Sequence, residues 1–109
     1  MTGVQTCALP ISLAAVSHAL ADEFGVTEQL TAEAAILGRN ALADRDAVAG
    51  VAARAWRWEP EMREVAEALR AVGLPTELAI AGAEVFTRWT PDKDDSGLDT
   101  ETALAHLRD

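Results

Sequence analysis

The sequence predicts an all-α fold of five to six helices. Apolar residues recur at helical spacing along most of the chain, and the alternating patterns and β-branched runs of strands are missing. Isolated glycines and proline-containing pairs separate the apolar stretches, as expected at helix ends. Half of the 109 residues are hydrophobic, with alanine dominant, so the composition is globular and the core depends on close approach of helices.

The first eleven residues, MTGVQTCALPI, differ in character from the rest. They hold the only cysteine, Cys7, and show no charge and no helical period. The string matches the conceptual translation of a common short-read sequencing adapter. We therefore expect residues 1–11 to be artefactual, Cys7 to have no functional role and the natural gene to extend further upstream. A natural N-terminus is the alternative, although a signal peptide would need a basic start and a continuous apolar stretch.

Three helices are predicted between residues 12 and 56. The first covers residues 12–24 and ends before Gly25. Its large apolar residues share one face, formed by Leu13, Val16, Leu20 and Phe24. The second covers residues 27–37, with Thr27 as N-cap and Gly38 after its end. Its inward residues are Leu30, Ala34 and Leu37. The third runs from residue 42 or 44 to 56, and its inward stripe consists of Val48, Val51, Ala52 and Ala55.

Three more helices are predicted after residue 56. One covers residues 60–72, because Pro60 suits a first turn and Gly73 a C-terminus. Its buried side comprises Met62, Val65, Ala66 and Leu69. The next runs from the cap Thr76 to residue 89 and has few polar residues, so we expect it to be largely buried. Its main stripe comprises Leu78, Gly82, Val85, Phe86 and Trp89. Residues 12–90 thus form one helical domain, followed by a solvated linker at 91–97 and a short terminal helix within 98–109.

Charge and length exclude several classes of function. The net charge of -9, with eight scattered arginines and the single Lys93, argues against nucleic-acid binding, including a helix-turn-helix, and against anionic membrane surfaces. No apolar run reaches the roughly 20 residues that span a bilayer. A single cysteine cannot form an internal disulfide, so the reducing cytoplasm is the expected compartment.

A search for catalytic residues yields none. The glycines are isolated, so no G-x-G-x-x-G loop is present to bind a dinucleotide. His18 and His106 lie far apart without metal-ligand spacing, and each is expected on a helix surface. The acidic run from Asp92 to Asp95 lacks the glycine and glutamate that a calcium loop needs. We therefore predict no catalytic, cofactor-binding or metal-binding residue in this chain.

The most unusual segment is Ala55-Trp56-Arg57-Trp58-Glu59-Pro60-Glu61-Met62, at a predicted junction of helices. One interpretation is structural: the indole rings seal the corner and Arg57 pairs with Glu59 or Glu61. The other is functional: the aromatic rings and a guanidinium line a ligand cleft and hold a carboxylate or phosphate. The candidate substrate-lining residues are Trp56, Arg57, Trp58, Glu61, Arg63 and Glu64.

Residues 55–94 carry a resemblance to a known family. The matching blocks are Trp56-Arg57-Trp58, Glu61-Met62-Arg63-Glu64-Val65-Ala66, Ala71-Val72-Gly73-Leu74-Pro75, Ala83-Glu84-Val85-Phe86-Thr87-Arg88 and Lys93-Asp94. In order and spacing they resemble the C-terminal domain of NAD(P)-dependent oxidoreductases related to phosphogluconate dehydrogenase, in the β-hydroxyacid dehydrogenase superfamily. Residues 12–54 are similar in general character only.

The resemblance implies a two-domain enzyme for a small hydroxy-acid-type substrate. NAD or NADP would bind an N-terminal Rossmann domain, and the helical domain would close the cleft and form a homodimer through helical faces. The family's catalytic lysine would lie just before Ser12, and no lysine of this chain matches it, because Lys93 lies near the other end. At about the place where the related dehydrogenases have a Lys-Asp pair that faces the cleft, this chain has Arg63-Glu64. The chain would therefore be inactive alone. The alternative is a free-standing acidic helical protein-interaction module.

Overall fold

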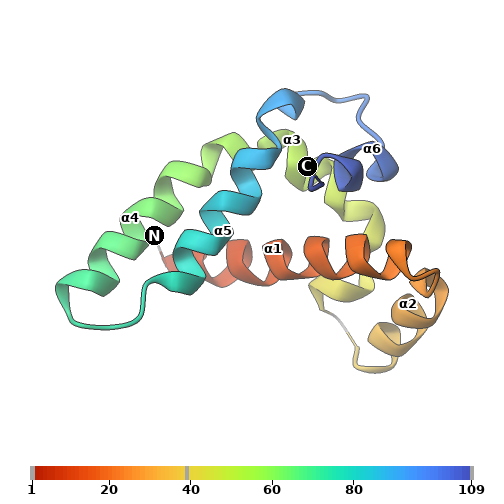
Figure 1. Cartoon of the computed structure of the whole chain (residues 1–109), viewed down its shortest axis with the longest axis horizontal. Coiled ribbons are helices and arrows are strands. Elements are labelled where there is room, and N and C mark those ends of the chain that lie inside the picture. The colour runs from red at the N-terminus through yellow and green to blue at the C-terminus, as the bar shows by residue number, and fades with distance from the viewer. Residues whose placement is uncertain (1, 39, 109) are drawn as a thin grey trace.

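The computed structural model describes residues 2–38 and 40–108, with side chains from residue 10 onward. This part of the chain is all-helical and contains no strand, which confirms the predicted fold class. Its α-helices are α1 (Thr2–Glu23), α2 (Thr27–Ile36), α3 (Val48–Arg54), α4 (Glu59–Ala71), α5 (Glu77–Arg88) and α6 (Thr100–Ala105). Four 3-10 turns lie between them: Ala41–Ala43, Arg45–Ala47, Ala55–Arg57 and Thr90–Asp92. Figure 1 shows α1 crossing the molecule, with the α4–α5 hairpin at one end and α2 at the other.

The α4–α5 hairpin forms as the sequence predicts. Pro60 occupies the first turn of α4, where its missing N–H has no intrahelical partner, and Gly73 after the helix adopts a left-handed φ of 75°. Buried Met62 of α4 packs against α5, where alanines at 79 and 83 are fully buried and allow the helices to approach closely. The prediction that Leu78 belongs to the buried stripe of α5 is wrong, because its side chain is exposed.

Trp89 connects α5 to the C-terminal helix. Its side chain is 1 % exposed, and its indole Nε1 donates a hydrogen bond to the carbonyl oxygen of Ala103 at 2.8 Å. Asp99 caps α6 by accepting a hydrogen bond from the backbone N–H of Thr102 at 2.7 Å. A helix as short as α6 is unstable in isolation, so these contacts and the burial of Leu104 hold it on the core.

The helix α1 begins earlier than predicted. It starts at Thr2 and continues through Pro10, whereas the apolar spacing predicts a start near Ser12. The residues before Ser12 carry no charge and no apolar period, so their helical conformation leaves no amphipathic pattern to detect. Ile11 is partly buried against the core, although it lies in the segment that we expected to be artefactual. The genetic origin of residues 1–11 stays a prediction.

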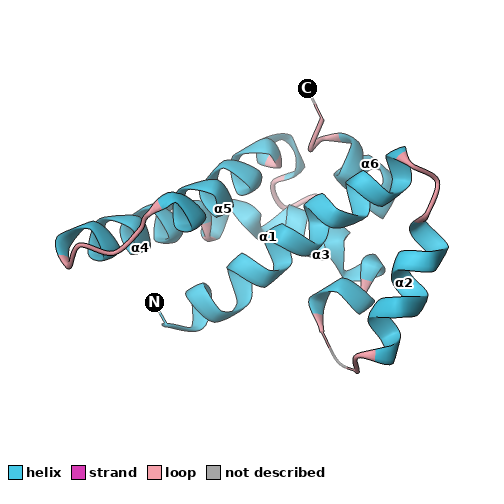
Figure 2. Cartoon of the chain, turned by 60° about the horizontal axis from the view of Figure 1, so that its bottom comes forward, coloured by secondary structure: helices cyan, strands magenta, loops and turns pink. Residues whose placement is uncertain are grey.

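The two faces of α1 differ in residue size. The face that packs against the bundle carries small side chains and one histidine: Ala14, Ala15, His18 and Ala21 are buried. The predicted stripe of Leu13, Val16, Leu20 and Phe24 lies on the opposite face and is exposed, with Phe24 at 71 %. In Figure 2, α1 lies across the front of the bundle, before α3. Because large apolar side chains are exposed on this outer face, it has the composition of a covered surface.

The segment between α2 and α3 also departs from the prediction. Residues 41–47 form two 3-10 turns in place of the start of an α-helix, because the Asn40 side chain caps this segment by accepting from the Ala43 N–H at 3.1 Å. The predicted inward stripe of the third helix is buried. Leu37, predicted to point inward from α2, is exposed. Among the described helices, none combines the length and apolar character that a membrane crossing requires.

Candidate functional site

At the corner between α3 and α4, the side chains of Trp56 and Trp58, two residues apart in the sequence, point in different directions. A 3-10 turn, Ala55–Arg57, precedes α4, and Ala55 is fully buried at this corner. Trp58 turns inward, where its ring lies 5.9 Å from that of Phe86 at an interplanar angle of 55°. This arrangement supports the structural interpretation for Trp58: its indole ring closes the corner against α5.

Trp56 turns outward and joins a polar cluster. Its indole Nε1 donates to Oδ1 of Asp94 at 3.0 Å, and the Nζ of Lys93 lies 4.4 Å from the centre of its ring. The guanidinium carbon of Arg57 lies 5.5 Å from the same ring. Both cations are therefore placed for cation–π contact with one exposed indole. The structure thus joins the Trp56-Arg57-Trp58 block to the Lys93-Asp94 block, which are distant in sequence.

Asp94 holds the cluster in an uncommon backbone conformation. Its φ is 57°, which makes it the one described non-glycine residue in the left-handed region. The backbone N–H of Asp94 donates to the carbonyl oxygen of Ala53 at 2.8 Å, and its carboxylate accepts from Trp56. The two bonds hold Asp94 against α3 and against the 3-10 turn that follows it. Sequence reasoning did not select Lys93 or Asp94 as site residues, although the resemblance included that pair.

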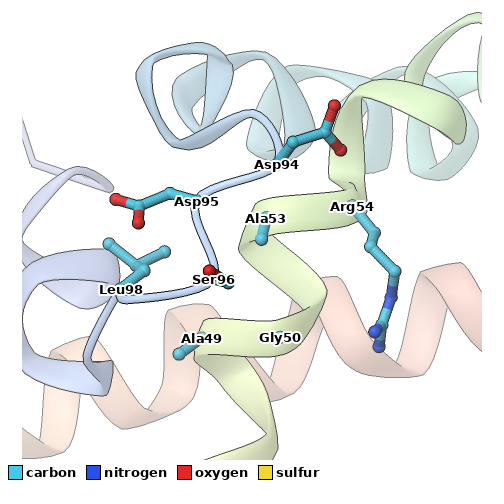
Figure 3. Close-up of a pocket in the computed structure, with 8 residues that line it drawn as sticks. All are labelled: Ala49, Gly50, Ala53, Arg54, Asp94, Asp95, Ser96 and Leu98. Atoms are coloured by element: carbon cyan, nitrogen blue, oxygen red, sulfur yellow. The ribbon is translucent and has the colours of Figure 1, made fainter.

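A shallow pocket of about 270 Å³ lies beside this cluster. Its lining comprises Ala49, Gly50, Ala53, Arg54, Asp94, Asp95, Ser96 and Leu98. Figure 3 shows the Asp94 carboxylate pointing upward near the end of α3 and the Arg54 guanidinium pointing downward along the helix. The Asp95 carboxylate accepts from the N–H of Gly97 at 2.9 Å and stabilises the turn. The polar groups of this lining are the Arg54 guanidinium, two carboxylates and the Ser96 hydroxyl.

The remaining candidates lie along α4. Arg63 pairs with Glu59, with 3.2 Å between Nε and Oε2, and its Nη2 lies 3.5 Å from the Thr87 hydroxyl of α5. Glu59 is therefore paired with Arg63, and Arg57 forms no ion pair among the described residues, so the predicted pairing of Arg57 with Glu59 or Glu61 is wrong. Glu61 is half-buried and Glu64 exposed. The six candidates thus do not form one cluster.

Both histidines make specific contacts. His18 is fully buried, and its Nε2 lies 2.9 Å from the carbonyl oxygen of Leu42, so its predicted surface position is wrong. Its Nδ1 is buried without a hydrogen-bond partner among the described groups. The Nδ1 of His106 lies 2.8 Å from Oδ2 of Asp92, which is buried although the linker was predicted to be solvated. Within the described part of the chain, no three metal-ligating side chains come together.

Asp22, near the end of α1, accepts hydrogen bonds from two side chains. It accepts hydrogen bonds from the Thr27 hydroxyl and, at 3.0 Å, from Nη2 of Arg45. Burial raises the pKa of Asp22, but these hydrogen bonds and the Arg45 charge outweigh burial and lower the pKa below its ordinary value. The pair joins α1 to the turn before α3, so its role is structural.

Comparisons with known proteins place this chain in a family. The sequence profile described as "Domain of unknown function (DUF1932)" matches residues 21–89, which is more than half of the chain. The match includes α2 to α5 and the α3–α4 corner. No match was found among the curated proteins or the solved structures. The chain therefore belongs to the DUF1932 family, the C-terminal domain found in 6-phosphogluconate dehydrogenase-like NAD(P)-binding proteins.

Proposed function

We propose that this chain is the helical domain that closes the substrate cleft and pairs the subunits of a cytoplasmic NAD(P)-dependent oxidoreductase. The substrate is a small hydroxy-acid-type molecule, and hydride transfer takes place on a Rossmann domain outside this chain. The observation that carries the proposal is the family match over residues 21–89. The exposed apolar face of α1 supports it, because a closing and pairing domain needs such a surface.

The described residues do not fit a nicotinamide cofactor. A dinucleotide pyrophosphate binds at a helix N-terminus that follows a glycine-rich loop. In the described segments that precede α2 to α6, glycines occur only singly, as Gly25, Gly38, Gly73 and Gly97, so none of these segments is a glycine-rich loop. We therefore propose that the cofactor binds to a domain outside this chain, and that this chain is inactive alone.

The substrate-facing residues are proposed to lie around the start of α4. Arg63 is held by Glu59 and Thr87, which fixes its guanidinium at the seam of α4 and α5. A guanidinium in a fixed position suits a substrate carboxylate. Arg57 stands on the outward side of the corner with Trp56, and the carboxylates of Glu61 and Glu64 complete the candidate lining. In the related dehydrogenases the position of Arg63-Glu64 is occupied by the Lys-Asp pair.

Cofactor titration tests whether the cofactor binds to this chain or to a domain outside it. The fluorescence of NADH and NADPH is followed while this chain, or the longer protein that its gene encodes, is added. We expect the longer protein to bind one of the cofactors and this chain to bind neither. Nanomolar binding by this chain alone would overturn the proposal, as would a longer protein that binds neither cofactor.

The arginines are tested in the longer protein. Arg63→Gln should raise KM for the hydroxy acid about tenfold or more, because it removes the charge proposed to hold the substrate carboxylate, and Arg57→Gln tests whether the outward side of the corner also faces the substrate. Arg70→Gln at the far end of α4 is the matched control and should leave KM unchanged. An equal effect of all three variants would remove Arg57 and Arg63 from the substrate site.

The free-standing interaction module is the second candidate. The apolar face of α1 favours it as well, since a recognition surface would look similar. The two proposals differ in the coding sequence upstream of Ser12. The module requires a genuine start codon near Ser12, whereas the dehydrogenase domain requires a reading frame that continues upstream.

A further inference from the structure

The cations at the α3–α4 corner lack the carboxylate partners that other cations of this chain have. The sequence contains 18 acidic residues against 9 lysines and arginines, so a carboxylate is rarely far from a cation. Several arginines pair with one: Arg45, Arg63, Arg70 and Arg108. Within the described part of the chain, no ion pair involves Arg54, Arg57 or Lys93. This corner is therefore a part of an acidic surface that can attract an anion.

The exposed ring of Trp56 gathers two of these cations. The Nζ of Lys93 lies 4.4 Å from the ring centre, and the guanidinium carbon of Arg57 lies 5.5 Å from it. The attraction between ring and cation limits the conformations of two otherwise flexible side chains. An ammonium and a guanidinium each carry several N–H donors, and no acceptor among the described residues takes a hydrogen bond from either group. Both cations therefore have donors open to a ligand.

The backbone around Asp94 fixes the place of Lys93. Asp94 has a φ of 57°, and its N–H donates to the carbonyl oxygen of Ala53 at 2.8 Å. A left-handed conformation costs free energy at a residue other than glycine, and such residues cluster at ligand sites. The Asp94 carboxylate accepts from the indole N–H of Trp56 at 3.0 Å and forms no ion pair with Lys93 or Arg57. Asp94 thus supports the ring and leaves both cations without a counter-ion.

We propose that Arg57 and Lys93 bind a small dianionic oxyacid, a dicarboxylate or a phosphate, at the α3–α4 corner. This rests on the substrate-facing role proposed for Trp56 and Arg57, and it deepens that role by adding Lys93 and the charge of the ligand. One guanidinium satisfies a single carboxylate, whereas a guanidinium and an ammonium together suit two negative charges. Because Arg57 precedes α4 and Lys93 follows α5, a ligand bound to both connects segments that are distant in sequence.

Nuclear magnetic resonance of the indole N–H groups tests the site in this chain. Sodium malonate, phosphate or acetate is added at about pH 8 and constant ionic strength, and Trp56→Phe assigns the Trp56 resonance by removing it. We expect that resonance to shift saturably with malonate or phosphate, with a Kd on the order of 1 mM, and acetate to bind at least about tenfold more weakly. The tighter of the two dianions identifies the class of ligand. The Trp89 resonance should not move, because its N–H bonds to Ala103 in the core.

Charge variants identify the cations that bind. Lys93→Gln and Arg57→Gln should each weaken binding of the dianion about fivefold, because each removes one of the two charges, and Lys93→Arg should retain binding. Arg54→Gln is the matched control, since it removes the same charge from a neighbouring exposed arginine. The Arg54 guanidinium points downward along α3, whereas the Asp94 carboxylate points upward (Figure 3). Its variant should change the Kd less than about twofold.

Three outcomes would overturn the proposal. The first is the absence of a saturable Trp56 shift up to about 50 mM malonate or phosphate, and the second is an equal affinity for acetate. The third is an effect of Arg54→Gln as large as that of Lys93→Gln, which would show attraction by net charge without a site. Circular dichroism checks that each variant is folded. The cofactor titration of the longer protein is independent of these results, so failure of the anion site is distinguishable from failure of the proposed function.

Discussion

Replacement of Trp89 by phenylalanine should cost a large part of the stability of this small domain. The indole Nε1 of Trp89 bonds the buried carbonyl of Ala103 at 2.8 Å, and the variant leaves that acceptor without its donor, at a cost of about 1–3 kcal/mol. The smaller ring leaves a void of some tens of Å³, which adds about 1 kcal/mol. The total of about 2–4 kcal/mol corresponds to a Tm lower by roughly 10–25 °C for a domain of this size.

Trp56→Phe is the control for this measurement. Trp56 is 39 % exposed, and water can replace its hydrogen bond to Asp94, so this variant should lose less than about 1 kcal/mol. Urea unfolding followed by circular dichroism gives both values, at a protein concentration below the dimer dissociation constant. Hydrogen exchange at Ala103 to His106 reports whether α6 opens first. A loss for Trp89→Phe no greater than for Trp56→Phe would refute the role assigned to Trp89.

Two further predictions concern pH and backbone conformation. Asp22 has a lowered pKa in the folded state, so its pairing with Arg45 stabilises the fold above the unfolded pKa of about 3.9 and is lost as pH falls through the folded value. Asp22→Asn should therefore lose about 1–2 kcal/mol at pH 7 and progressively less below pH 4 in urea titrations; a pH-independent loss would contradict this. Gly73→Ala should lose about 1 kcal/mol, because the φ of Gly73 is 75°. Gly50→Ala should gain about 0.5–1 kcal/mol, since its added methyl would lie in α3 at 3.6 Å from the flexible Arg54 guanidinium; equal shifts of the two glycine variants would refute the distinction.

The helices α4 and α5 were predictable because local signals agree there. Pro60 and Gly73 mark the ends of α4, and Met62 and Val65 mark a core face that polar residues surround. The segment at 41–47 was less predictable, since its 3-10 turns depend on the Asn40 side chain rather than on apolar spacing. The start of α1 could not be predicted, because residues 2–11 contain no charged residue and therefore no alternation of polar and apolar faces.

The orientation of α1 and the shape of the site required the structure. Sequence spacing groups Leu20 with Phe24 but does not say that the alanine side of the helix faces the core. Trp56 contacts Lys93 and Asp94, which lie far from it in the sequence, and no local sequence pattern predicts such a contact. The buried position of His18 follows from its bond to the Leu42 carbonyl, which also depends on tertiary packing.

The central claim is that these helices serve a cofactor-binding domain encoded upstream of codon 12. The most direct measurement is the chromosomal DNA sequence ahead of that codon. The account predicts an open reading frame in phase with Ser12, with a glycine-rich strand–loop–helix motif and a lysine codon shortly before codon 12. An in-frame stop codon or a promoter at that position would contradict it.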